Sequence, residues 1–338
     1  MPSIVIGRLP GPVLQVLPLG ATVHRLEVGA RVRRNVVLGH PGTDDYLASA
    51  DFVGGTIGRY ANRIAEGRFE LDGVEHRVGL NDRGHHLHGG PDGFHRRVWD
   101  VVSRSDDEVV LGLESPDGDQ GFPGRVTARV RFAVTGDTVV VEMTATTDAP
   151  TLVNLTQHTY FCLDGAVGGV SDVRDHLLRV AADRFTPTDA TGIPLGDHAP
   201  VEGTPFDLRS PTRLGDVVAD PHPQMALGGG IDHNFVPEGH GLRPVAELSC
   251  RRTGTAVVVA SDQPGLQVYT GQGFDGSRRS VEGVPLGPYA GVALEPQLAP
   301  DSPHHLVGPD WPSAVLRPDA TYRSVLEWRF RETPAGTG

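Results

Sequence analysis

Polar and apolar side chains alternate along residues 152–161, which we expect to form one β-strand. The polar face of this strand consists of Asn154, Thr156, His158 and Tyr160. Hydrogen-bonding groups in such a row suit a wall that binds a ligand rich in hydroxyl groups, and His158 is a candidate proton donor or acceptor. The solvent-facing side of an ordinary strand would show the same pattern, and this segment alone does not decide between the two.

A glutamate in a second apolar segment, residues 291–297, is a candidate general base. Glu295 shares a strand face with Gln297, and a carboxylate at the end of an apolar strand is expected to be partly desolvated, which raises its pKa. Pro296 cannot donate to a sheet, so we expect the strand to end there or to lie at a sheet edge. The alternative for Glu295 is a strand-end side chain turned towards water.

Two arginines and an asparagine follow a glycine-rich turn in residues 54–64. The glycine spacing is not that of a dinucleotide-binding loop, and no strand–turn–helix unit surrounds it. Arg59, Asn62 and Arg63 could donate fixed hydrogen bonds to the oxygens of a ligand. Alternatively, the segment is a structural loop tied down by arginine–carboxylate pairs.

Histidines cluster in residues 85–90, where His86 and His88 would share a strand face. Clustered histidines raise the question of a metal site, but the third and fourth ligands that such a centre needs are not evident in the sequence. We therefore expect no metal here. A single histidine of the cluster that donates a hydrogen bond is the simpler interpretation.

Short strands and tight turns should position these residues, because the chain of 338 residues contains 44 glycines and 28 prolines. Residues 125–134 alternate strictly between apolar and polar side chains, and Asp72-Gly73 predicts a hairpin between 69–71 and 74–78. Further strands are expected at 13–18, 22–28, 109–114, 138–141, 176–183, 244–250, 255–261, 265–270, 289–297 and 323–330.

Helical periodicity is confined to short turns at 61–65 and 208–214, and residues 184–235 and 298–318 are expected to be loops. A succession of strands without alternating helices favours an antiparallel arrangement. We therefore predict an all-β protein, a large antiparallel β-sandwich with few short helices, which forms a single domain over residues 1–338.

Charge and composition narrow the classes of partner and chemistry. The chain has 42 acidic and 30 basic residues, a net charge of −12, and every basic residue is an arginine. The absence of lysine excludes Schiff-base and P-loop lysine chemistry, and the acidic excess argues against nucleic acid and anionic membranes. Two cysteines are too few for a disulfide framework. Without an evident signal peptide or membrane span, we expect a cytoplasmic protein; its oligomeric state is left open.

Eight short motifs, in order along nearly the whole chain, resemble those of the aldose 1-epimerase (galactose mutarotase) family. They are residues 58–64, 87–90, 121–124, 156–161, 203–207, 231–235, 265–270 and 294–297. The family's fold is a large antiparallel β-sandwich, in agreement with the strand pattern. The chain departs from the residues usual in the family at Gln157, Cys162, Pro296 and Asp319, which leaves the sugar preference open.

The resemblance implies that His158 is the general acid and Glu295 the general base of anomer exchange in a free aldohexose such as galactose or glucose. It implies that sugar contacts come from Asn62, Arg63, His88, Asp232 and Gln267. A small-molecule sugar is then the substrate, and neither a metal nor an organic cofactor is needed.

Other interpretations stay open. A hexose-6-phosphate 1-epimerase would need arginines for the phosphate, for which Arg96 and Arg97 are candidates. A non-catalytic sugar-binding protein on the same fold could dispense with the acid or the base, whereas this sequence has both. A glycosidase would need two carboxylates flanking the bond, for which Asp232 and Glu295 are available.

Overall fold

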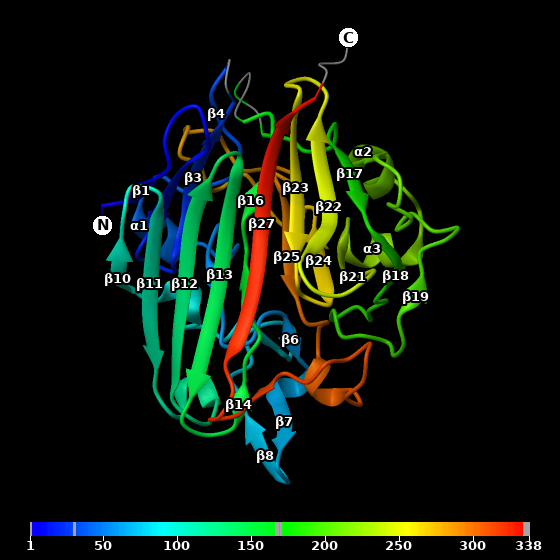
Figure 1. Ribbon diagram of the computed structural model, residues 1–338. Coiled ribbons are helices and arrows are strands. Elements are labelled where there is room, and N and C mark those ends of the chain that lie inside the picture. Colours follow the sequence, from blue (N-terminus) through cyan, green and yellow to red (C-terminus); the bar gives the residue numbers. More distant parts are fainter. Residues whose placement is uncertain (1, 30–31, 166–168, 170, 334–338) are drawn as a thin grey trace.

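Strands are the main regular structure of the computed structural model, which describes residues 2–29, 32–165, 169 and 171–333 (Figure 1). The α-helices in this part of the chain are short: α1 (Thr43–Ala48), α2 (Leu214–Val218) and α3 (Pro223–Gly228). None of these helices has the length and apolar character that crossing a membrane requires. Single turns of 3-10 helix also occur, at η1 (Ala65–Gly67), η2 (Phe94–Arg96), η3 (Asp119–Gly121) and η5 (Ser302–His304).

One wall of the molecule is a nine-stranded antiparallel sheet. In spatial order its strands are β10 (Asp100–Arg104), β11 (Glu108–Ser115), β12 (Val126–Thr135), β13 (Thr138–Thr147), β27 (Tyr322–Glu332), β23 (Thr255–Ser261), β22 (Arg243–Cys250), β17 (Leu177–Val180) and β20 (Thr212–Arg213). The alternation expected at 125–134 is confirmed in β12, where Val126 and Val130 are buried while Thr127 and Arg129 are exposed. Neighbouring side chains of a strand point to opposite faces, so one face of the sheet is covered and the other meets solvent.

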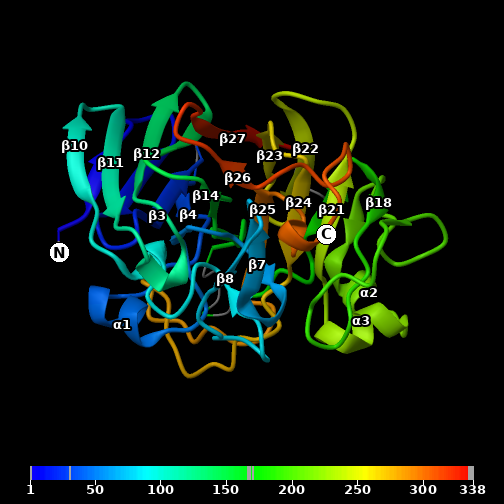
Figure 2. The same cartoon turned by 90° about the horizontal axis from the view of Figure 1, so that it is seen from below.

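A six-stranded sheet packs against the covered face. Its order is β16 (Tyr160–Phe161), β25 (Val292–Gln297), β24 (Gly265–Tyr269), β21 (Asp232–Pro237), β18 (Ala182–Phe185) and β19 (Ala199–Pro200). Figure 2 shows β25, β24 and β21 beneath β27, β23 and β22. Across the interface, the ring of Phe161 meets that of Trp328 edge-on, with 5.4 Å between centroids. This is the large antiparallel sandwich that the strand pattern predicts.

Smaller sheets complete the fold. A four-stranded sheet contains β1 (Ile4–Ile6), β2 (Val13–Leu17), β3 (Thr22–Val28) and β4 (Arg34–Asn35). The two-stranded pairs are β5 (Thr56–Ile57) with β15 (Thr156–Gln157), β6 (Arg63–Ile64) with β9 (His86–Leu87), β7 (Arg68–Leu71) with β8 (Val74–Arg77), and β14 (Thr151–Leu152) with β26 (Val315–Leu316). The β7–β8 hairpin confirms the turn expected at Asp72-Gly73.

The single strand expected at 152–161 is wrong. The segment instead contributes β14, β15 and β16 to three different sheets, and its polar and apolar side chains are both buried. The chain bends between these short strands as it passes from one sheet to the next. Alternation along the sequence therefore does not divide its side chains into a solvent-exposed face and a buried face. The solvent-facing alternative is excluded as well, since His158 is 4% exposed.

The expected helical turns also need correction. Residues 61–65 contain strand β6, and the helix near 208–214 begins only at Leu214. The stretch 184–235, expected to be a loop, holds the end of β18, β19, β20, α2, α3 and the start of β21. The stretch 298–318, also expected to be a loop, holds η5 and β26. In these regions tertiary pairing decides the conformation of segments whose own periodicity is weak.

Candidate active site

A cavity of about 210 Å³ lies where β21, β24 and β25 meet the segments that carry β6 and β9. The residues that the family resemblance marks all line it: Asn62, Arg63, His88, His158, Asp232, Gln267 and Glu295. They come from six separate parts of the chain, so the sandwich brings together side chains up to 233 positions apart. The cavity has room for a small polar molecule and is walled mainly by hydrogen-bonding groups.

Strand register places two of the residues that line this cavity, Gln267 and Glu295, side by side. Gln267 on β24 lies opposite Glu295 on β25 and opposite Asn234 on β21, so the three side chains form a row across the sheet. Glu295 is 1% exposed, which corrects the alternative of a side chain turned to water. Strand β25 does not end at Pro296 but continues to Gln297. On one side it pairs with β16, and only through Val292 and Ala293. Pro296 therefore has no strand neighbour on that side to which a backbone N–H group would have to donate.

Backbone hydrogen bonds fix the position of His158 next to Glu295. The His158 amide donates to Gly55 O at 2.9 Å, and its carbonyl accepts from the Gly54 amide at 2.9 Å. Gly54 has φ +65°, and a Cβ there would lie 2.2 Å from Val23 O, so this turn needs glycine. The result is a distance of 3.4 Å between His158 Nε2 and Glu295 Oε1.

Burial opposes charge on both members of this pair. It lowers the pKa of His158 to about 4 and raises the pKa of Glu295 well above its usual value. Nearby charges modify these shifts: Asp232 favours protonation of both groups, whereas Arg63 favours the Glu295 carboxylate. Between its two macroscopic pKa values the pair holds one exchangeable proton. One group can then give a proton while the other takes one.

His88 has a fixed tautomer. Its Nδ1 accepts a hydrogen bond from the Asn62 amide at 3.1 Å, and burial lowers its pKa well below the usual value, so the neutral ring carries its proton on Nε2. The ligand atoms of His88, His158 and Glu295 come within 4.8 Å of one another, but a protonated Nε2 cannot bind a metal ion. The trio therefore fits a hydrogen-bonding site better than a metal centre.

Arg63 and Asp232 present free hydrogen-bonding groups to the cavity. Arg63 Nε donates to Asp82 Oδ2 at 2.8 Å, while its terminal nitrogens have no hydrogen-bond partner among the described residues. Asp232 Oδ1 accepts from Gln267 Nε2 at 2.7 Å, which leaves Oδ2 available. A guanidinium and a carboxylate held in this way can donate to and accept from ligand hydroxyl groups.

Comparison with known proteins identifies the family. The aldose 1-epimerase family model matches residues 8–329. The chain is 37% identical to the aldose 1-epimerase of Escherichia coli K12 over 95% of its own length and 92% of that protein, and 37% identical to the galactose mutarotase of Rattus norvegicus over 94% and 90%. The chain belongs to the aldose 1-epimerase family. It is therefore an isomerase.

Solved structures agree with this family membership. An aldose epimerase homologue from Caenorhabditis elegans superimposes with a TM-score of 0.89 at 27% identity, over 98% of this chain and 99% of that one. The galactose 1-epimerase of Lactobacillus acidophilus NCFM gives 0.85 at 29% identity, over 98% and 94%. The aldose epimerase fold thus extends over nearly the whole of this chain.

Some arginines that the sequence offers as ligand-binding residues of this epimerase lie outside the cavity. Arg59 does not line the cavity but donates to Ser115, Pro116, Pro123 and Gly124. These acceptors are carbonyl and hydroxyl oxygens, so the expected arginine–carboxylate pairs are wrong for it. The phosphate candidates are also outside: Arg96 donates to Leu47 O and Arg97 to Asp119.

Phe52 and Arg83 line the cavity of this epimerase and were not among the predicted site residues. Phe52 has φ +56°, and its ring lies 4.6 Å from His88, 4.7 Å from His95 and 5.7 Å from His158 between centroids. It thereby helps to exclude water from the histidines. An aromatic residue next to a glycine-rich turn is too common to have marked it in the sequence.

Proposed function

We propose that this protein exchanges the α and β anomers of a free aldohexose such as galactose or glucose. The observation that carries the proposal is the His158–Glu295 pair, 3.4 Å apart in a cavity of about 210 Å³ whose other lining residues are mainly donors and acceptors for hydroxyl groups. The relatives named aldose 1-epimerase and galactose mutarotase support the same activity.

The proposed reaction starts from the one-proton form of the pair in which Glu295 is ionised and His158 is protonated; Arg63 favours the Glu295 carboxylate and Asp232 favours the protonated His158. Glu295 then takes the proton from the anomeric hydroxyl group while His158 donates its proton to the ring oxygen. The C1–O5 bond breaks, the C1 oxygen becomes a carbonyl, and the ring opens. Rotation about C1–C2 exposes the other carbonyl face, and the two residues return their protons in reverse as the ring closes. Each positioned proton transfer contributes about 10²–10⁴-fold.

The remaining polar groups hold the sugar. The free N–H groups of Arg63 and the Nε2–H of His88 donate to sugar oxygens and stabilise negative charge that gathers at the ring oxygen. Asp232 accepts from sugar hydroxyl groups, and Asn62 and Gln267 supply amide contacts. These roles rest on the placement of all five residues around the cavity.

The charges of the cavity favour a neutral sugar over a phosphorylated one. Asp51, Asp232 and Glu295 line it together with the guanidinium groups of Arg63 and Arg83, and Asp82 already pairs with both arginines. Little positive charge is left for a phosphate dianion. A hexose-6-phosphate 1-epimerase is therefore the less supported alternative.

Anomer exchange of freshly dissolved α-galactose or α-glucose, followed by polarimetry or NMR, tests the proposal. Because each residue carries one proton transfer, Glu295→Gln and His158→Asn should each lower the rate by about 10²–10⁴-fold, whereas Glu70→Gln, on an exposed position of β7, should not change it. If both site variants keep wild-type rates, the assignment is wrong. A side-by-side assay with glucose, galactose, xylose, arabinose and glucose-6-phosphate would establish the preferred sugar.

We also propose that residues 1–338 form one domain and that the protein is cytoplasmic, binds neither nucleic acid nor membrane, and needs no cofactor. Continuous packing between the two large sheets supports the first point. A single cooperative unfolding transition would support one domain, and cell fractionation tests the cytoplasmic location. Full activity after dialysis against a chelator tests whether the activity is independent of a metal cofactor.

A further inference from the structure

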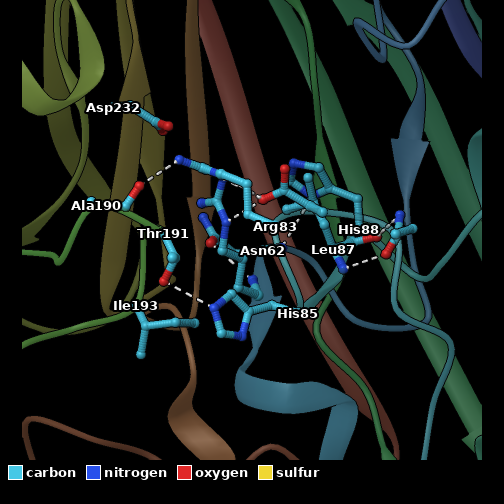
Figure 3. Close-up of polar contacts among 12 residues, drawn as sticks. Asn62, Arg83, His85, Leu87, His88, Ala190, Thr191, Ile193 and Asp232 are labelled. Carbon is cyan, nitrogen blue, oxygen red and sulfur yellow. Dashed lines mark hydrogen bonds and ion pairs between the residues drawn. The ribbon is translucent and has the colours of Figure 1, made fainter.

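A small hairpin at residues 188–194 reaches the edge of the sugar cavity. Thr188 and Pro194 pair as an isolated bridge, the Asp189 amide donates to Ile193 O at 2.8 Å, and the Gly192 amide donates to Asp189 O at 3.1 Å. These bonds define the tip of the hairpin. In Figure 3 its residues Ala190, Thr191 and Ile193 face the segment that carries Arg83 and His85.

Gly192 at this tip lies against Arg63. A Cβ on Gly192 would come within 2.7 Å of Arg63 Cζ and Nη1 and within 3.0 Å of Nε. The Arg63 side chain is 8% exposed and has Asp82 as its hydrogen-bond partner among the described residues. Asp82 holds only Nε, and the backbone of Gly192 lies beside the rest of the guanidinium, so the space at position 192 is one of the limits on where the Arg63 side chain can lie.

The segment that supplies Asp82 also holds the hairpin in place. Arg83 Nη1 donates to Ala190 O at 3.1 Å. His85 Nδ1 accepts from the Glu66 amide at 2.9 Å, so its Nε2 donates to Thr191 Oγ1 at 2.9 Å. The Thr191 hydroxyl then donates to Asp189 Oδ1 at 2.7 Å. Every donor in this series has an acceptor, which fixes the hairpin relative to Arg63.

The other end of the hairpin is tied to the strand that carries Asp232. The Thr188 amide donates to Gln224 Oε1 and its carbonyl accepts from Gln224 Nε2, at 2.8 and 2.9 Å. His233 Nδ1 accepts from the Asp232 amide at 3.2 Å, so its Nε2 donates to Gln224 Oε1 at 3.0 Å. The hairpin therefore links the Arg63 side of the cavity to the Asp232 side.

We propose that hairpin 188–194 is a brace that positions Arg63 for the sugar, with Gly192 as a positioning residue that itself makes no sugar contact. This inference rests on the proposed function, since it concerns the same cavity. It predicts that any side chain at position 192 displaces the Arg63 guanidinium and weakens sugar binding without touching the His158–Glu295 pair.

Gly192→Ala tests the brace, with Gly73→Ala as its matched control. Both glycines have positive φ, +86° and +79°, but nothing lies within 4 Å of a Cβ built on Gly73, so both variants carry similar backbone strain and only one meets Arg63. Because small displacements of binding groups cost up to about 100-fold, we expect Gly192→Ala to lower galactose affinity and kcat/KM about tenfold, mainly through KM. Gly73→Ala should leave both at the wild-type value.

Combination with Arg63→Met shows whether Gly192 acts through Arg63. If it does, adding Gly192→Ala to Arg63→Met should change galactose affinity by less than about twofold. Thr191→Val breaks the hydrogen-bond series without adding an atom beside Arg63, and we expect about a threefold loss of affinity from it. Full additivity in the double variant, or wild-type affinity in Gly192→Ala, would overturn the brace.

Isothermal titration calorimetry with D-galactose measures affinity independently of turnover. If the wild-type protein binds galactose but does not accelerate anomer exchange, the proposed function fails, while the affinities of the variants still decide on the brace. Melting temperatures of Gly192→Ala and Gly73→Ala should fall by similar amounts, since both place alanine at positive φ.

Discussion

Arg59 and Arg63 stand four positions apart in one motif, yet their surroundings differ completely. Arg59 is 2% exposed, and its Nε, Nη1 and Nη2 all donate to oxygens of residues 115–124. Arg63 is 7% exposed and has hydrogen bonds only to Asp82 from its side chain, within the part of the chain described. Burial alone therefore does not distinguish the two arginines.

The number of satisfied donors does distinguish them. A buried guanidinium whose nitrogens all have acceptors stabilises the loop around it and has no donor left for a ligand. A buried guanidinium with idle N–H groups facing a cavity keeps its binding capacity for a substrate. Glu295 resembles Arg63 in this respect, because it is buried and its Oε2 has no hydrogen-bond partner among the described residues.

The largest effect that should separate the two arginines is on folding. Arg59→Met would leave several buried oxygens in residues 115–124 without a donor, so we expect the free energy of unfolding to fall by about 3–5 kcal/mol. Arg63→Met should cost only about 1–2 kcal/mol, because it removes one side-chain hydrogen bond and Asp82 keeps Arg83 as a partner. Urea unfolding measures both values, and equal losses would contradict the division into structural and binding arginines.

The next effect concerns activity and should run in the opposite order. Arg63→Met removes the free donors from the cavity, and we expect kcat/KM for anomer exchange to fall about 100-fold, or about 2.7 kcal/mol. Arg59→Met, assayed as the folded fraction at low temperature, should keep KM within about twofold of wild type, because Arg59 does not line the cavity. A larger loss of kcat/KM in Arg59→Met than in Arg63→Met would reverse the comparison.

The smallest effect is on the pH dependence. We expect a bell-shaped profile of kcat/KM. As the pH falls, a second proton binds the His158–Glu295 pair and no base remains; since burial lowers the pKa of His158 to about 4, this limb should lie below pH 6.5. As the pH rises, the last proton leaves, on a limb that the raised pKa of Glu295 moves upwards.

Arg63→Met should shift only the alkaline limb. Arg63 lowers the pKa of Glu295 by its positive charge, so its loss should raise that pKa and move the alkaline limb to higher pH. Initial rates from polarimetry, corrected for the spontaneous reaction, give the profile. Arg59→Met serves as the control and should leave both limbs in place. A shift of the alkaline limb to lower pH in Arg63→Met would contradict the stabilisation of the Glu295 carboxylate by Arg63.

Regular strands can be predicted from the sequence where one face of the strand is exposed to solvent and the other is buried. The alternation of β12 and the β7–β8 turn are local properties of the chain, and both were located from sequence to within about two residues. The segment around His158 was not, because it changes sheets twice and is buried on all sides. The motifs nevertheless marked His158, since a family resemblance does not depend on the local conformation.

The sequence by itself determined the antiparallel sandwich, the family and seven of the residues that line the cavity. Only the tertiary structure decided which of the two arginines is free to bind, that Glu295 is buried, and that Gly192 lies against Arg63. The physical reason is that alternation and turn preference act between neighbouring residues. The partners of a buried polar group come from segments far apart in the chain, and those partners determine whether the group stabilises the fold or remains available to a sugar.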